Sequence, residues 1–180
     1  MRSARQSRAF TLVEMLGAMT IVGVAGLAAT TVATRAVADV RDASTAWSLH
    51  QDTAAALDRI VQEVRAVAKD TTTGGPAFSL LSATQITLAS GVGIRFIDAT
   101  GSTPGRIDLT VGGTTSTLLS NATSMSVSVL TGTGTILPFP LSTALAAATA
   151  RRITITLSAT RNGVTETLRT SIYLRSLAGS

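Results

Sequence analysis

The chain is 180 residues long, which is enough for one modest domain and an extended helix. It has no cysteine and only one histidine, His50. The lack of cysteine excludes disulfides and thiol nucleophiles, and a single histidine leaves almost no residues from which a zinc site or a histidine-based triad could be built. The formal charge is +5, but beyond the first nine residues only 12 basic and 10 acidic side chains remain. This weak charge, without any run of lysine and arginine, argues against nucleic-acid binding.

The chain begins with a basic leader, residues 1–9, followed by a long apolar segment, residues 10–34. The leader carries Arg2, Arg5 and Arg8, whereas Glu14 is the one charged residue of the apolar segment. As a helix, these 25 residues would extend about 37 Å, more than the roughly 30 Å of a bilayer's hydrocarbon core. The arginines before the segment predict that the N-terminus is cytoplasmic and that the remainder lies outside.

Two ordinary interpretations of this segment leave residues unexplained. A cleaved signal peptide would use the sequence Ala36-Val37-Ala38 and leave a chain that begins at Asp39. The apolar run is longer than the usual stretch of about 7–15 residues, however, and it contains Glu14. A plain transmembrane anchor explains the length and the orientation, but neither Glu14 nor the string FTLVEML that begins at Phe10.

A third interpretation rests on a resemblance. The basic leader, the small residue Ala9 and the string FTLVEML closely resemble the N-terminus of type IV pilins and of type II secretion pseudopilins. The resemblance implies that a prepilin peptidase cuts between Ala9 and Phe10 and that the new amine of Phe10 is N-methylated. Ala9 stands where the family usually carries glycine. Glu14 becomes the fifth residue of the mature chain, the position at which the family carries a glutamate.

Glu14 has a physical role in this interpretation. A carboxylate inside an apolar segment is costly unless a specific partner neutralises it. In a bundle of such helices, Glu14 of one subunit can pair with the cationic Phe10 amine of its neighbour, which removes two isolated buried charges. The alternative is that Glu14 lies at the headgroup boundary and reaches toward water.

Residues 35–70 are predicted to continue the helix as an amphipathic stalk. No glycine or proline interrupts them, and Arg59 and Glu63 are spaced i, i+4. Apolar residues at helical spacing form one stripe, which comprises Leu57, Ile60, Val61, Val64, Val67 and Ala68, with Trp47 and Ala54 as a possible extension. We therefore expect one helix from about residue 11 to 69, whose second half lays this stripe on a globular domain.

Residues 77–180 are predicted to form a β-rich head. Alternating segments predict strands at 85–88, 94–98, 106–111, 125–129, 152–157 and 164–174, and Arg161-Asn162-Gly163 supplies the last hairpin turn. Glycine-rich turns are expected at 112–113 and 131–135, and a short helix or a loop at 142–150. One polar and one apolar face per strand favour an antiparallel sheet packed on the helix, hence an α+β fold. The stretch 57–70 followed by such a head resembles minor pilins of the J/W-like type.

The remaining chemistry-bearing residues form no active-site motif. Asp98 and Asp108 lie in strand-like runs and could contact calcium, as in some pseudopilins, although a solvated sheet face is the favoured alternative. Lys69 has no serine at the spacing of a Ser-Lys dyad motif. No catalytic residue, metal or cofactor is predicted.

The sequence therefore predicts a structural subunit, a minor pilin or pseudopilin, rather than an enzyme. It would sit in the inner membrane with its head periplasmic or extracellular and assemble with other pilins into a helical filament of a type IV pilus or type II secretion system. Its processing partner would be the prepilin peptidase and N-methyltransferase. The alternative is a single-pass anchored extracytoplasmic binding domain that does not polymerise and keeps residues 1–9.

Overall fold

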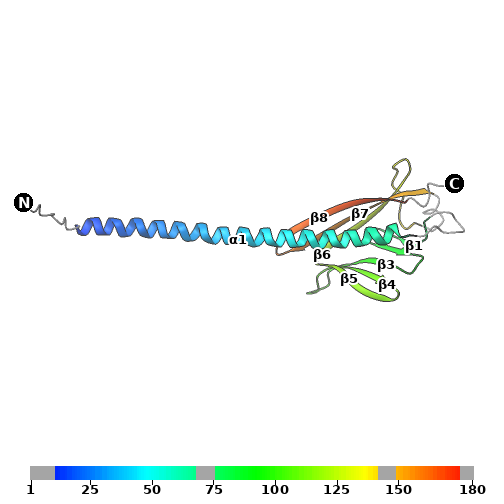
Figure 1. The fold of residues 1–180 in the computed structure, drawn as a ribbon, viewed down its shortest axis with the longest axis horizontal. Helices are drawn as coiled ribbons and strands as arrows, with labels where there is room; N and C mark the ends of the chain where they lie inside the picture. Colours follow the sequence, from blue (N-terminus) through cyan, green and yellow to red (C-terminus); the bar gives the residue numbers. More distant parts are fainter. Residues whose placement is uncertain (1–10, 68–75, 142–148, 175–180) are drawn as a thin grey trace, which may run out of the picture. The chain divides into compact units, whose positions relative to one another are not determined.

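The computed structural model describes residues 11–67, 76–141 and 149–174. A long helix, α1 (Leu12–Arg65), precedes strands that pair antiparallel throughout the described chain (Figure 1), which confirms the α+β prediction. The strands are β1 (Phe78–Leu81), β2 (Gln85–Leu88), β3 (Gly93–Ile97), β4 (Arg106–Val111), β5 (Thr114–Ser120), β6 (Ala122–Thr131), β7 (Ala150–Arg161) and β8 (Val164–Tyr173). Most of the alanine-rich stretch 142–150 lies outside the described residues.

The chain divides into two compact units, Met1–Ser44 and Thr45–Ser180, and the division falls within α1. In the first unit, every described residue from 11 to 44 is exposed. Its threonine hydroxyls are nevertheless satisfied within the helix: Thr20 donates to the Leu16 carbonyl at 2.8 Å, and Thr34 donates to the Thr30 carbonyl at 3.0 Å. This segment of α1 thus exposes apolar side chains without adding hydroxyls that require water.

In the second unit, α1 buries one stripe of its surface. The buried residues are Leu49, Thr53, Ala56, Leu57, Ile60, Val61 and Val64. The predicted stripe over 57–64 is confirmed, but its extension to Trp47 is wrong, because the Trp47 side chain is 66% exposed. Trp47 precedes Leu49 by two residues and so points about 200° away around the helix axis. The predicted contact between Arg59 and Glu63 is present.

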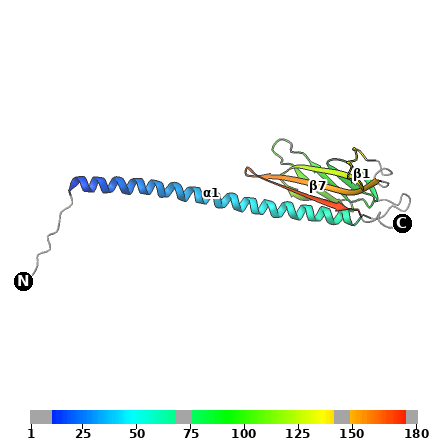
Figure 2. The same ribbon diagram turned by 90° about the horizontal axis from the view of Figure 1, so that it is seen from above.

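The strands form two sheets instead of the single sheet expected. One has the order β1-β2-β3-β4-β5 and the other the order β6-β7-β8. Each sheet turns one apolar face inward, and these faces share one hydrophobic core with the α1 stripe. In both views, the part of α1 that belongs to this unit runs beside β8 (Figures 1 and 2). The predicted packing of helix on sheet is confirmed.

Strand prediction succeeds where alternation is strong and fails where it is weak. The bounds of β2 and β4 agree with the predicted ranges 85–88 and 106–111. The alternation pattern does not predict β1, whose pairing with β2 contains an irregularity between Phe78 and Leu80, or β5, whose first four residues are all exposed. Both are edge strands of the five-stranded sheet. An edge strand can pair with its neighbour without a strict alternation of apolar and polar residues, so its sequence carries a weaker signal.

The hairpin turn between β7 and β8 lies at Asn162 and Gly163, as predicted. Their φ angles are 52° and 83°. Positive values at both central residues are what a two-residue hairpin requires, because this turn matches the right-handed twist of the strands. The expected turn at 131–135 is closed by a hydrogen bond from the Thr131 amide to the Thr135 carbonyl at 2.9 Å.

Gly105 lies where the backbones of the two sheets come together. A Cβ atom at this buried position would lie 2.3 Å from the Ala122 carbonyl oxygen, which belongs to β6, and 3.2 Å from the carbonyl oxygen of Ile97 in β3. Both neighbours are main-chain atoms of paired strands, so neither can move away without disturbing a sheet. Glycine is therefore the residue that fits this junction.

We expect Gly105→Ala to destabilise the protein by about 1–3 kcal/mol, because the added methyl group has to displace main-chain atoms. Thermal unfolding of the full chain in detergent would show a midpoint lowered by about 3 °C or more. Gly93→Ala in β3 is the matched control, since its Cβ would meet only Thr110 Cβ at 3.8 Å, an ordinary contact. Equal midpoints for the two variants would contradict this account.

Candidate functional site

The first turn of α1 is closed by a reciprocal set of hydrogen bonds between Thr11 and Glu14. The Thr11 amide donates to Glu14 Oε2 at 2.9 Å, and the Thr11 hydroxyl donates to the same oxygen at 3.1 Å. In the other direction, the Glu14 amide donates to Thr11 Oγ1 with 3.3 Å between nitrogen and oxygen. Thr11 is thus the N-cap and Glu14 the third helical residue of a capping box.

The capping box gives Glu14 a partner within its own chain. A helix start leaves amide groups without intrahelical acceptors, and leaving such a group unsatisfied costs several kcal/mol in hydrocarbon. The bonds of Glu14 engage Oε2, whereas Oε1 has no hydrogen bond with any described residue. The carboxylate can therefore accept a further donor without giving up the cap. The spacing Thr-x-x-Glu is the signal in the sequence that indicates this cap.

The residues expected at the processing site fall before the described part of the chain. Ala9, Phe10 and the three leader arginines lie within residues 1–10, so their predicted roles stay predictions. Immediately after them, α1 is the one described helix that is long and apolar enough to cross a membrane. The described residues thus begin with a capped and exposed apolar helix directly downstream of the expected cut.

His50 takes part in tying α1 to the last hairpin. Its Nδ1 lies 2.8 Å from Glu166 Oε1 on β8, and its ring stacks on Trp47 with 6.4 Å between the ring centroids. Two residues further along α1, Asp52 Oδ2 accepts a hydrogen bond from Arg161 Nη2 at 2.8 Å. The sequence reasoning missed both pairs, since partners more than 100 residues apart leave no local pattern. These contacts hold α1 against the last hairpin.

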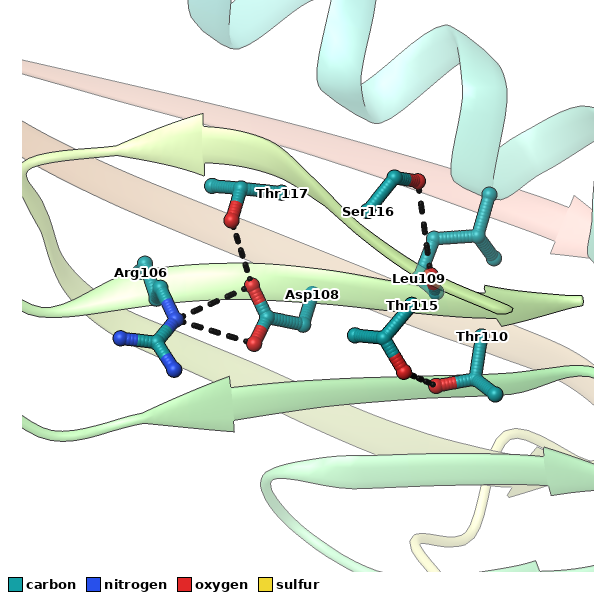
Figure 3. Close-up of polar contacts among 7 residues, drawn as sticks. All are labelled: Arg106, Asp108, Leu109, Thr110, Thr115, Ser116 and Thr117. Carbon is teal, nitrogen blue, oxygen red and sulfur yellow. Dashed lines mark hydrogen bonds and ion pairs between the residues drawn. The ribbon is translucent and has the colours of Figure 1, made fainter. Parts of the chain in front are cut away.

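The two aspartates considered for calcium are in different surroundings. Asp108 on β4 is only 7% exposed, so the expectation of a solvated sheet face is wrong for this residue. Its carboxylate accepts hydrogen bonds from Arg106 Nε at 3.0 Å and from Thr117 Oγ1 at 2.9 Å (Figure 3), which occupies the oxygens that an ion would need. Asp98 follows the end of β3 and is exposed, as expected for a solvated residue. Among the described residues, no three metal-ligating side chains of His, Cys, Asp or Glu gather in one place.

Comparison with known proteins places the identifiable similarity at the N-terminus. A comparison of the chain with curated proteins gave no match. Residues 4–30 match the family model described as the prokaryotic N-terminal methylation motif. This range includes Ala9, Phe10, the capping box and the first half of the exposed apolar helix. The chain therefore carries a prepilin-type N-terminal methylation motif, consistent with the type IV pilin and pseudopilin family that FTLVEML resembles.

Proposed function

We propose that this chain is a minor pilin or pseudopilin, a structural subunit of a filament of the type IV pilus or type II secretion kind. One observation carries the proposal: the methylation motif at residues 4–30 leads directly into a helix that is exposed over residues 11–44. A motif of this kind marks a substrate of processing and implies no catalysis by the chain itself.

The exposed helix serves two environments in turn. Before assembly, residues 10–34 lie in the inner membrane, and the leader arginines keep the N-terminus in the cytoplasm. Cleavage between Ala9 and Phe10 then removes the leader while the apolar helix stays with the mature chain. In the filament, helices of neighbouring subunits replace lipid around the same side chains. Each subunit is rotated relative to the next without closing into a ring, so the subunits form a helical fibre.

The charged residues just after the apolar segment support a second copy of this chain as the partner. Arg35, Asp39, Arg41 and Asp42 alternate in sign along α1, are all exposed, and form no ion pair with any described residue. A surface with both signs in alternation is complementary to a copy of itself. Ion pairs between the helices of adjacent subunits would satisfy these charges beyond the apolar core of the fibre.

Glu14 has two separable roles in this proposal. Its Oε2 completes the capping box with Thr11, and its remaining acceptor capacity receives the methylated Phe10 amine of the neighbouring subunit. The cap fixes the carboxylate at the start of the helix before assembly, so little side-chain entropy is lost when the pair forms. The amine and the carboxylate then enter the apolar core as a pair and not as two isolated charges.

We expect the mature chain to begin at an N-methylated Phe10. Mass spectrometry of the protein expressed with its native prepilin peptidase tests this expectation directly. Expression without the peptidase is the control and should leave residues 1–9 attached. A chain that keeps its leader in the presence of the peptidase would indicate the anchored binding domain instead, and a chain that begins at Asp39 would indicate a secreted protein.

Three substitutions separate the two roles of Glu14. Glu14→Gln keeps a side chain that can complete a capping box but removes the charge, whereas Glu14→Ala removes both. Thr11→Ala weakens the cap, by about 0.5–2 kcal/mol, and leaves the charge. We expect both Glu14 variants to be processed and yet to form filaments poorly, and Thr11→Ala to assemble far better, as measured by the ratio of filament to mature monomer. Normal assembly of Glu14→Gln would rule out the charge pairing.

A further inference from the structure

We propose that the second unit carries a binding pocket for a neutral saccharide at the junction of its two sheets. The pocket has a volume of about 540 Å³, within the range of roughly 300–1,000 Å³ that is typical of small-molecule sites. Its walls come from the end of β3 at Phe96, from the following loop with Asp98 and Gly105, and from Asn121 between β5 and β6. Thr123 on β6 and Thr160 on β7 complete them. All of them belong to the same unit.

The polar groups of this pocket are not used by the fold. Asp98, Asn121 and Thr123 are lining residues of the pocket, and none of their side chains has a hydrogen bond or ion pair with a described residue. Asp108 on the neighbouring strand offers a contrast, because its carboxylate is filled by Arg106 and Thr117 (Figure 3). The pocket therefore has an acceptor, an amide and a hydroxyl available for a ligand.

Apart from Thr160, whose hydroxyl bonds to Thr165, the remaining lining is apolar. Phe96 is partly buried against the hydrophobic core, and Ala99, Pro104 and Ala122 complete the wall. A sugar ring has hydroxyl groups around its edge and C–H groups on its faces, so it requires both kinds of contact at once. The carboxylate can accept bonds from two neighbouring hydroxyls, the amide both donates and accepts, and the apolar wall covers the ring face.

The charge of the pocket narrows the class of saccharide. Asp98 is the one charged residue of the lining, and no described cation pairs with it, so an acidic sugar would be repelled. Neutral hydrogen-bonding groups outnumber the single carboxylate, which favours a neutral polyhydroxyl ligand over a simple amine. A hydrogen bond to a carboxylate is stronger than one between neutral groups, so Asp98 is expected to contribute most to affinity.

The walls are already held in place without a ligand. The Thr160 amide donates to the Asn121 carbonyl at 2.9 Å, which fixes the connection between β5 and β6 against β7. Gly105 lies close to the main chain of Ala122, with no space for a side chain between them. A preformed pocket loses little conformational entropy on binding. None of its walls belongs to the exposed helix.

Binding is tested with the full chain in a detergent that has no sugar headgroup. A panel of neutral hexose and N-acetylhexosamine oligosaccharides is screened, and the affinity of any that binds is measured by titration calorimetry. We expect at least one of these probes to bind, and Asp98→Asn and Asn121→Gly each to weaken it by about tenfold or more. Glycine is chosen at position 121 because the φ angle there is 59°.

Asp58→Asn is the matched control. It makes the same chemical change at an exposed position on α1 outside the pocket and should leave the affinity unchanged. Unfolding midpoints should be equal for Asp98→Asn and the wild type, because Asp98 has no partner in the fold. The proposal is overturned if no neutral oligosaccharide of the panel binds, if a simple polyamine binds instead, or if binding survives both pocket substitutions.

Discussion

The apolar surface of α1 is the constraint on which the rest of this protein depends. From Leu49 onward, the helix buries its apolar stripe against the two sheets of its own chain. Before Thr45, every described side chain is exposed, and no described residue covers it. One continuous helix therefore supplies the core of a folded unit and also an apolar surface that something outside the chain must cover, first lipid and then, in the proposed filament, other helices.

The start of this helix shows how a charged residue is tolerated beside so much apolar surface. Glu14 is engaged by the backbone and the hydroxyl of Thr11, so its carboxylate is partly compensated within its own chain. The pairing predicted from the sequence and the cap found in the structure are compatible, since they draw on different lone pairs of one carboxylate. A local bond of this kind lowers the cost of placing a carboxylate in an apolar environment.

The periodicity of the sequence predicts the regular parts of the fold well. The helical stripe from Leu57 to Val64 and the hairpin at Asn162-Gly163 follow from local pattern and turn chemistry. The division into two sheets does not, because no local pattern shows that Gly105 meets the main chain of Ala122 where the two sheets come together. The pocket is beyond sequence reasoning for a similar reason: Asp98 and Asn121 follow β3 and β5, which lie on either side of β4 in one sheet, and neither residue belongs to a motif.

The contacts of His50 and Asp52 with the last hairpin have a mechanical consequence. Both pairs join the first buried turns of α1 to Glu166 and Arg161 at the tip of the β7–β8 hairpin. A force applied along the axis of α1 would shear the helix against the hairpin. These contacts and the underlying core would then share the force, so that several contacts would have to break at the same time. A force applied across the axis would open them one after another. The second unit therefore resists tension along its helix better than tension across it, and the proposed filament would pull on it along the helix.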